Sequence, residues 1–253
     1  MSRIALLALL AFGFLAGLIV FAPLETALRI SGAEARGLGW SKAEGTILDG
    51  KLNGITLDGS SQGNAELKLM PLALLSGQLQ YAVVWIGDHG EGAGNVSIGT
   101  GARATLRQFD LELDLLRLDQ AALWIRQSGG RVHLKGEVVR FGAAGCVEAT
   151  GTATSDVLER NIEILGAGWS PMRGELRCES GDLVIPLESA NASGTRFLAQ
   201  LRIAPGRPGR FDARVSGLLP RELDYALPIA GFTRDGADYV YSFSTSDQSG
   251  PTR

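Results

Sequence analysis

The sequence has little of several things that mark familiar classes of protein. Of its 253 residues only 20% are charged and 7% are aromatic, and the net charge is -3. Nucleic-acid binding needs clustered Lys and Arg, so this balance gives no electrostatic case for it. The chain lacks H-E-x-x-H and P-loop motifs, and its two histidines, His89 and His133, do not have metal-ligand spacing. We therefore expect no catalytic residue, no cofactor and no metal ion.

Cysteine is also scarce, because Cys146 and Cys178 are the only two in the chain. No C-x-x-C pair exists, so neither a zinc knuckle nor a redox motif is indicated. Two interpretations remain open. In an oxidising compartment the pair would form one disulfide, which would close a loop of about thirty residues and contribute about 3 kcal/mol. Otherwise the two residues would be buried free thiols.

Glycine, in contrast, is abundant, with 34 residues, and a hydrophobic fraction of 45% is enough for a folded core. No Gly-X-Y period exists, which excludes a collagen-like chain. Glycines spread among short apolar runs are typical of an all-β chain with many tight turns. The predicted fold class is therefore all-β: an N-terminal transmembrane helix followed by a glycine-rich, mostly antiparallel β-sheet domain with a few short helices.

The transmembrane prediction rests on the apolar run from Ile4 to Ala22, which contains no charged or strongly polar side chain. As a helix this run would rise about 28 Å, close to the ~30 Å hydrocarbon core of a bilayer. Arg3 and the free amine precede it, whereas Glu25 comes before Arg29 on the other side. This bias of positive charge places the N-terminus in the cytoplasm and the rest of the chain outside.

A cleaved signal peptide is the main alternative to this anchor. The apolar run is longer than the roughly 7–15 residues usual for a signal peptide. The best cleavage site, after Ala22, would also leave Pro23 directly after the cut, where signal peptidases tolerate proline badly. A core helix of a soluble domain is a third reading, but such a helix usually carries a polar face. In an anchor, the Gly13-x-x-x-Gly17 pattern could bring two helices together as a homodimer.

The anchor prediction divides the chain into five parts. They are a cytoplasmic stub (1–3), the transmembrane helix (4–22), a connector (23–35), a periplasmic β-rich domain (36–241) and a flexible tail (242–253). Ser76-Gly77-Gln78-Leu79 is echoed by Arg173-Gly174-Glu175-Leu176. This echo raises the hypothesis of two related halves, 36–128 and 129–241, although glycine-rich β-chains also echo themselves by chance.

Turns, strands and helices can be placed within this domain. Asp49-Gly50 and Asp58-Gly59 are expected to be hairpin turns, and Gly90 to Gly94 a flexible connection. The predicted strands include Ala102–Leu106, Phe109–Leu113 and Met172–Glu179. The predicted helices are Leu24–Ile30, a short one from Pro71, Asp119–Gln127, Ser155–Asn161 and Pro220–Ala226. The four tryptophans are expected in the core, with contact anchors as the alternative: Trp40, Trp85, Trp124 and Trp169.

One block near the start of the domain carries a family resemblance. It reads G-T-I-L-D-G-K-L-N-G and is followed, after Met70, by P-L-A-L-L-S-G-Q-L. The order resembles the type II secretion system protein N family (general secretion pathway protein N), most specifically over the first third of the chain. Leu48 stands where family members often carry an aromatic residue. The motif residues are Gly45, Thr46, Gly50, Gly54, Pro71 and Gly77.

The resemblance implies a non-enzymatic accessory component of the inner membrane, without a cofactor, that serves the export of folded proteins across the outer membrane. Its partners would be the secretin and the inner-membrane platform proteins. An alternative from another class is an AsmA-like envelope protein that binds or transfers lipid in an apolar β-groove. The feature that discriminates between the two is a continuous apolar trough on one sheet face, open to solvent.

Overall fold

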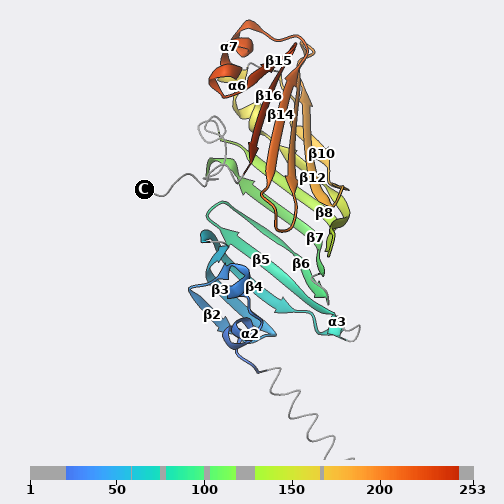
Figure 1. The fold of residues 1–253 in the computed structure, drawn as a ribbon. Coiled ribbons are helices and arrows are strands. Elements are labelled where there is room, and N and C mark those ends of the chain that lie inside the picture. The colour runs from blue at the N-terminus through green and yellow to red at the C-terminus, as the bar shows by residue number, and fades with distance from the viewer. Residues whose placement is uncertain are drawn as a thin grey trace, which may run out of the picture. The chain divides into compact units, whose positions relative to one another are not determined.

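The computed structural model describes residues 21–57, 59–74, 78–99, 103–117, 129–165 and 168–244. They form mostly antiparallel β-sheet with a few short helices, which confirms this part of the predicted fold class (Figure 1). Within those ranges no helix has both the length and the apolar character needed to cross a membrane. The predicted transmembrane segment, Ile4 to Ala22, lies outside them except for its last two residues.

The chain divides into two compact units, Met1–Ile98 and Gly99–Arg253. In the first unit the strand order is β1-β3-β4-β5-β6, and β2 pairs with β3 beside β1. Neighbouring strands in this order are therefore close in sequence. The elements are α2 (Leu24–Ile30), η1 (Glu34–Arg36), β1 (Leu38–Gly39), β2 (Lys42–Gly45), β3 (Asp49–Leu57), β4 (Ser60–Leu69), α3 (Pro71–Leu74), β5 (Leu79–Gly87) and β6 (Gly90–Gly99).

One face of the sheet of the first unit gathers apolar side chains from neighbouring strands. Leu67 of β4 lies opposite Val83 of β5, and Leu69 opposite Tyr81. The other face carries an ion pair between Lys51 and Glu66. The buried apolar side chains among the described residues of this unit are Leu24, Leu52, Ala65 and Leu69. The described part of this unit thus buries few large side chains.

The second unit continues the up-and-down pattern with the strand order β7-β8-β9-β10-β12-β13-β14-β16-β15, and β11 also pairs with β12. Its first elements are β7 (Arg103–Asp114), η2 (Leu115–Arg117), β8 (Arg131–Gly142), β9 (Gly145–Ser155), α5 (Val157–Arg160), α6 (Ile162–Leu165), β10 (Met172–Glu175) and β11 (Arg177–Glu179). The remaining ones are β12 (Asp182–Ala190), β13 (Arg196–Ile203), β14 (Arg210–Ser216), α7 (Arg221–Ile229), β15 (Thr233–Asp235) and β16 (Asp238–Ser244).

Two hydrophobic clusters form the core of the second unit. In the first, the short helices α5, α6 and α7 bury Leu158, Leu165, Leu223 and Leu227 against Phe197 and neighbouring side chains of the sheet. The second cluster lies within the sheet and gathers apolar side chains from β7, β8, β9 and β12 with Leu176, including Phe109, Leu134, Val139, Ala153, Leu183 and Ile185. The apolar face of this sheet is therefore covered along much of its length.

Several predicted boundaries differ from the structure. Asp49-Gly50 is not a hairpin turn, because β2 ends at Gly45 and β3 already begins at Asp49. Gly90 to Gly94 is not a flexible connection, because it lies in β6 and pairs with β5. The two strands expected at Ala102–Leu106 and Phe109–Leu113 are one strand, β7, with Gln108 at a positive φ of 47° between them.

Other differences concern the second half of the chain. The expected strand Met172–Glu179 is divided into β10 and β11 at Leu176, whose side chain is buried in the second cluster. The last strand, β16, continues to Ser244, beyond the expected start of the tail. The predicted helix Asp119–Gln127, with Trp124, lies outside the described residues. Trp169 is buried, as expected of a core residue.

Candidate functional site

The first family-motif residues build the turn between β2 and β3. Gly45 has a φ of +83°, a backbone conformation that favours glycine. The hydroxyl of Thr46 accepts hydrogen bonds from the backbone N–H groups of Leu48 at 3.2 Å and Asp49 at 3.3 Å. The N–H of Thr46 donates to the carbonyl of Asp49 at 2.9 Å. Gly45 and Thr46 therefore form the turn. The sequence analysis predicted this turn at Asp49-Gly50, four residues later.

The remaining motif residues seat neighbouring elements. A Cβ at Gly50 would lie 2.5 Å from Cδ2 of Leu24, a buried residue of α2, so only glycine lets α2 pack this closely on β3. The N–H of Gly54 donates to Oδ1 of Asn64 at 2.9 Å. Pro71 is the first residue of α3, as predicted, and Gly77 lies outside the described residues. Gly45, Thr46, Gly50 and Gly54 thus shape a hairpin and bring no reactive groups together.

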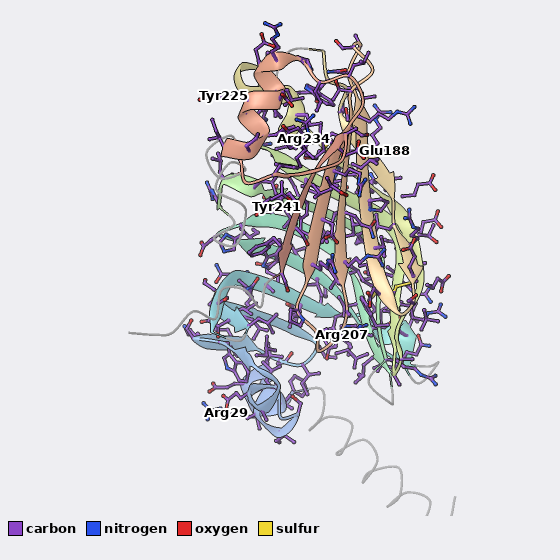
Figure 2. All side chains as sticks on the ribbon, turned by 45° about the horizontal axis from the view of Figure 1, so that its top comes forward. Arg29, Glu188, Arg207, Tyr225, Arg234 and Tyr241 are labelled. Carbon is purple, nitrogen blue, oxygen red and sulfur yellow. A yellow bond between two sulfur atoms is a disulfide. The ribbon has the colours of Figure 1, made fainter. Side chains whose placement is uncertain are left out.

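The second unit carries a hollow of about 1260 Å³ on its sheet. The side chains that face it come from alternate positions of β10, β12, β13, β14 and β16, and Figure 2 labels Glu188 among them. The register sets Arg173 beside Glu188, and Asp212 beside Gln200 and Ser242. The lining also includes Thr152, Thr154, Glu175, Arg177, Pro186, Leu198, Arg210, Arg214, Asp235 and Val240.

Ion pairs hold one side of this hollow. On β14, Arg210 contacts Asp212 at 2.8 Å, and Arg214 contacts Asp238 of β16 at 2.8 Å and Asp235 at 3.6 Å. The hydroxyl of Ser242 donates to the Asp212 carboxylate at 2.7 Å. The hydrogen bond to Asp212 raises the pKa of Arg210 above its usual range. These contacts pair the charges on the β14 side with one another.

The opposite side of the hollow is less occupied. Arg173, Glu175 and Glu188 are exposed, and the structure records no ion pair for them among the described residues. Nearby, the carboxylate of Glu179 forms ion pairs with Arg177 at 2.5 Å and with Arg202 at 3.0 Å. The hydrogen bond from Arg177 lowers the pKa of Glu179, burial opposes this, and a weaker hydrogen bond from Arg202 lowers the pKa further. Charged groups of both signs are therefore available to a polar ligand.

The sequence analysis missed these charged residues, although a signal was present. Arg173-Gly-Glu175-Leu-Arg177 and Arg210-Phe-Asp212-Ala-Arg214 both alternate charged and small or apolar residues with a period of two. Such alternation places three charges of both signs on one sheet face. What the sequence alone does not reveal is that β10 and β14 belong to one hollow, separated only by β12 and β13.

The structure pairs the two cysteines in a disulfide, with a Cα–Cα distance of 5.4 Å and a sequence separation of 32 residues. Cys146 is the second residue of β9 and Cys178 lies in β11. The backbone N–H of Cys146 also donates to the carbonyl of Gly181 at 2.7 Å. Cys146 belongs to the second hydrophobic cluster, and Cys178 packs against it. Of the two interpretations left open by the sequence, the structure contains the disulfide.

The histidines lie apart from the hollow's ion pairs. Nε2 of His133 is 2.5 Å from Oδ1 of Asp110, and Nζ of Lys135 is 3.5 Å from the same carboxylate. The hydrogen bond from His133 lowers the pKa of Asp110. His89 lies in the β5–β6 turn. Among the described residues, no group of His, Cys, Asp and Glu could hold a metal ion.

A serine motif that the sequence analysis passed over also proves structural. Gly59-Ser60-Ser61-Gln62-Gly63 matches G-x-S-x-G, the pattern of a nucleophile elbow between a strand and a helix. Here Ser61 lies in β4, just after the β3–β4 hairpin turn. Its hydroxyl donates to the carboxylate of Asp88 at 3.3 Å, but a nucleophile elbow needs a strand-to-helix turn, and here the turn joins two strands. The match is therefore in letters only.

Three comparisons with known proteins complete this description. No curated protein and no solved structure matches the chain. A family model, described as type II secretion system (T2SS), protein N, matches residues 36–242. This range covers most of the chain and spans both compact units. It includes the hairpin of β2 and β3 that contains Gly45, Thr46, Gly50 and Gly54 (the motif hairpin), and it extends into β16. The chain belongs to the type II secretion system protein N family.

Proposed function

We propose that this chain is a non-enzymatic accessory component of the type II secretion system. In this proposal its N-terminal segment holds it in the inner membrane with the N-terminus in the cytoplasm. The β-rich part acts as a periplasmic scaffold during export of folded proteins across the outer membrane. The observation that carries the proposal is the family match over residues 36–242.

The disulfide supports the periplasmic location. Disulfides form and persist in oxidising compartments such as the bacterial periplasm and are rare in the reducing cytosol. Cys146 and Cys178 sit on neighbouring elements at bonding distance, so the fold itself brings them together. The excess of positive charge before the apolar segment 4–22 predicts the same orientation.

The hollow of the second unit supports a scaffold that recognises polypeptide. An AsmA-like lipid groove would need a continuous apolar trough. The hollow instead exposes Arg173, Glu175 and Glu188, and an acyl chain placed there would desolvate their charges without compensation. Partner subunits with charged and polar groups, such as the secretin or the platform proteins, fit this surface better.

Deletion of the gene for this chain in its own host tests the proposed function. The culture medium is then assayed for exoproteins that depend on type II secretion, together with a periplasmic marker enzyme as the control for leakage. We expect exoproteins to accumulate in the periplasm, and the full-length chain to restore their release. Unchanged release in the deletion strain would refute a required accessory role.

Recovery of partners tests the same proposal directly. A C-terminally tagged copy is purified from membranes after mild crosslinking and gentle solubilisation, and the co-purifying proteins and lipids are identified. The secretin and the inner-membrane platform subunits should be enriched over an unrelated single-pass protein with the same tag. Retained phospholipid without any secretion subunit would favour the lipid-groove alternative instead.

A further inference from the structure

The outer side of α7 is apolar and exposed. The inner side of this helix, Leu223 and Leu227, is buried in the first cluster. On the outer side, Tyr225 is 76% exposed and Ile229 is 73% exposed. Residues four apart are neighbours on a helix surface, so these two side chains form one patch. Figure 2 shows Tyr225 on the side of α7 that faces away from the strands.

The neighbourhood of this patch is also apolar. From Tyr225 to Phe232 the chain reads Y-A-L-P-I-A-G-F, without a charged side chain. Leu218, just before the helix, is 76% exposed, and Ile162 of α6, which packs against α7, is 53% exposed. A helix that is apolar on both sides is normally covered on both sides. A gathering of exposed apolar side chains marks an interaction site.

The exposed patch is held in place by buried contacts. The fully buried hydroxyl of Thr195 donates to the carbonyl of Leu218. The hydroxyl of Tyr239 donates to Oδ1 of Asp224 at 2.9 Å, and the N–H of Phe232 donates to the carbonyl of Leu227 at 3.0 Å. These bonds fix the start, the middle and the end of the α7 segment. A partner would therefore meet a surface that needs little ordering.

The charges at the border of the patch select among occupants. The first turn of α7 carries two exposed carboxylates, Glu222 and Asp224, and one guanidinium, Arg221. Helices that lie on anionic membranes are rich in Lys and Arg on their polar face, which this border is not. A second copy in a two-fold contact would bring the same acidic border against itself. The charges favour a different protein with a basic border.

We propose that the outer side of α7, defined by Tyr225 and Ile229, docks a protein partner. That partner presents an apolar pocket bordered by Lys or Arg. The aromatic ring of Tyr225 is the central anchor, since buried aromatic side chains dominate the energetics of interfaces. Glu222 and Asp224 set the orientation through complementary charge. This inference rests on the proposed function, because the partner would be another subunit of the secretion machine.

Photocrosslinking in intact membranes tests this docking surface. The full chain carries benzoylphenylalanine in place of Tyr225, and a control copy carries it in place of Val84, an exposed residue of β5. We expect position 225 to give an adduct with one protein, whose crosslinked peptide lies on an apolar surface bordered by Lys or Arg. Position 84 should give no such adduct. Adducts with phospholipid or a second copy, or no adduct, would overturn the proposal.

Second substitutions show whether the adduct depends on the patch. Ile229→Ser and Glu222→Arg should each lower the adduct yield about tenfold, as loss of an anchor or of border charge would. Ile86→Ser, which changes an exposed isoleucine of β5 in the other unit, should leave the yield unchanged. Equal yields in all three variants would contradict the docking surface. Unchanged unfolding midpoints verify that Leu223 and Leu227 remain packed.

The secretion assay separates this inference from the proposed function. If deletion of the chain leaves secretion unchanged, the proposed function fails, and the crosslink from position 225 still decides whether α7 docks a protein. If deletion abolishes secretion and position 225 gives no protein adduct, the docking inference alone fails. An adduct with a secretion subunit that Ile229→Ser removes supports both.

Discussion

The two compact units follow the same up-and-down strand order but hold themselves together differently. The second unit has two hydrophobic clusters, three short helices over its sheet and a disulfide. The described part of the first unit buries only a few apolar side chains and relies on the motif hairpin to seat α2 against β3. Equal topology therefore does not mean equal stability. We expect the second unit to be the rigid one.

The largest effect should come from a cavity in the second unit. Leu158 of α5 is fully buried in the first cluster, so Leu158→Ala should destabilise that unit by about 2–5 kcal/mol. Leu79→Ala in β5, where the side chain is 48% exposed, should cost less than about 1 kcal/mol. Urea unfolding of the full chain in detergent measures both, with the separate fluorine NMR signals of fluorotryptophan at Trp169 and Trp85 as the reporters of the two units. Equal losses of unfolding free energy in Leu158→Ala and Leu79→Ala would contradict the difference in packing between the two units.

Loss of the disulfide should be the next largest effect, and it should be confined to the second unit. Replacing Cys146 and Cys178 together by Ser opens a loop of 32 residues and should cost about 3 kcal/mol, because the unfolded chain gains freedom. The Trp169 transition should move to lower urea concentration while the Trp85 transition stays in place. A reducing agent should have the same effect on the native chain and none on the double variant.

A smaller effect is expected from the motif hairpin of the first unit. Gly50→Ala places a Cβ against Leu24 and should cost about 1–3 kcal/mol through overpacking. Leu24→Ala removes the obstructing methyl groups, so the double variant should lose less than the sum of the two single variants. The Trp85 transition reports both. Simple additivity would mean that Gly50 does not act through its contact with α2.

The smallest effect should appear in acid. Arg177 and then Arg202 lower the pKa of Glu179 in the second unit, and Lys42 lowers that of Glu44 in the first. A lowered carboxyl pKa contributes stability above its unfolded value, and that stability is lost as the pH falls through the folded value, below about pH 4.3. Carboxyl NMR titration measures both residues. Arg177→Gln should leave part of the shift at Glu179, whereas Lys42→Gln should remove most of that at Glu44.

How much the sequence could predict also differs between the units. Glycine content and alternation predicted the mostly antiparallel β-sheet, and the block from Gly45 to Gly54 predicted the family. The predicted position of the first turn was wrong. Asp49-Gly50 is a common turn dipeptide, but the turn is stabilised by the Thr46 hydroxyl, which accepts two backbone hydrogen bonds. The hollow could not be predicted, since it depends on which strands become neighbours. The apolar outer side of α7 could not be predicted either. Helical spacing indicates that Leu223 and Leu227 are buried, but it does not show whether Tyr225 is buried or exposed.

The strand order has a consequence for how the chain is made. Within each unit most strands pair with one that immediately precedes them in sequence, so few segments must await a distant partner. A chain threaded across a membrane from its N-terminus could add one ladder at a time as it emerges, which limits the time for which unpaired edges are exposed to aggregation. The bond between Cys146 and Cys178 would then form midway through emergence, before β12 to β16 arrive.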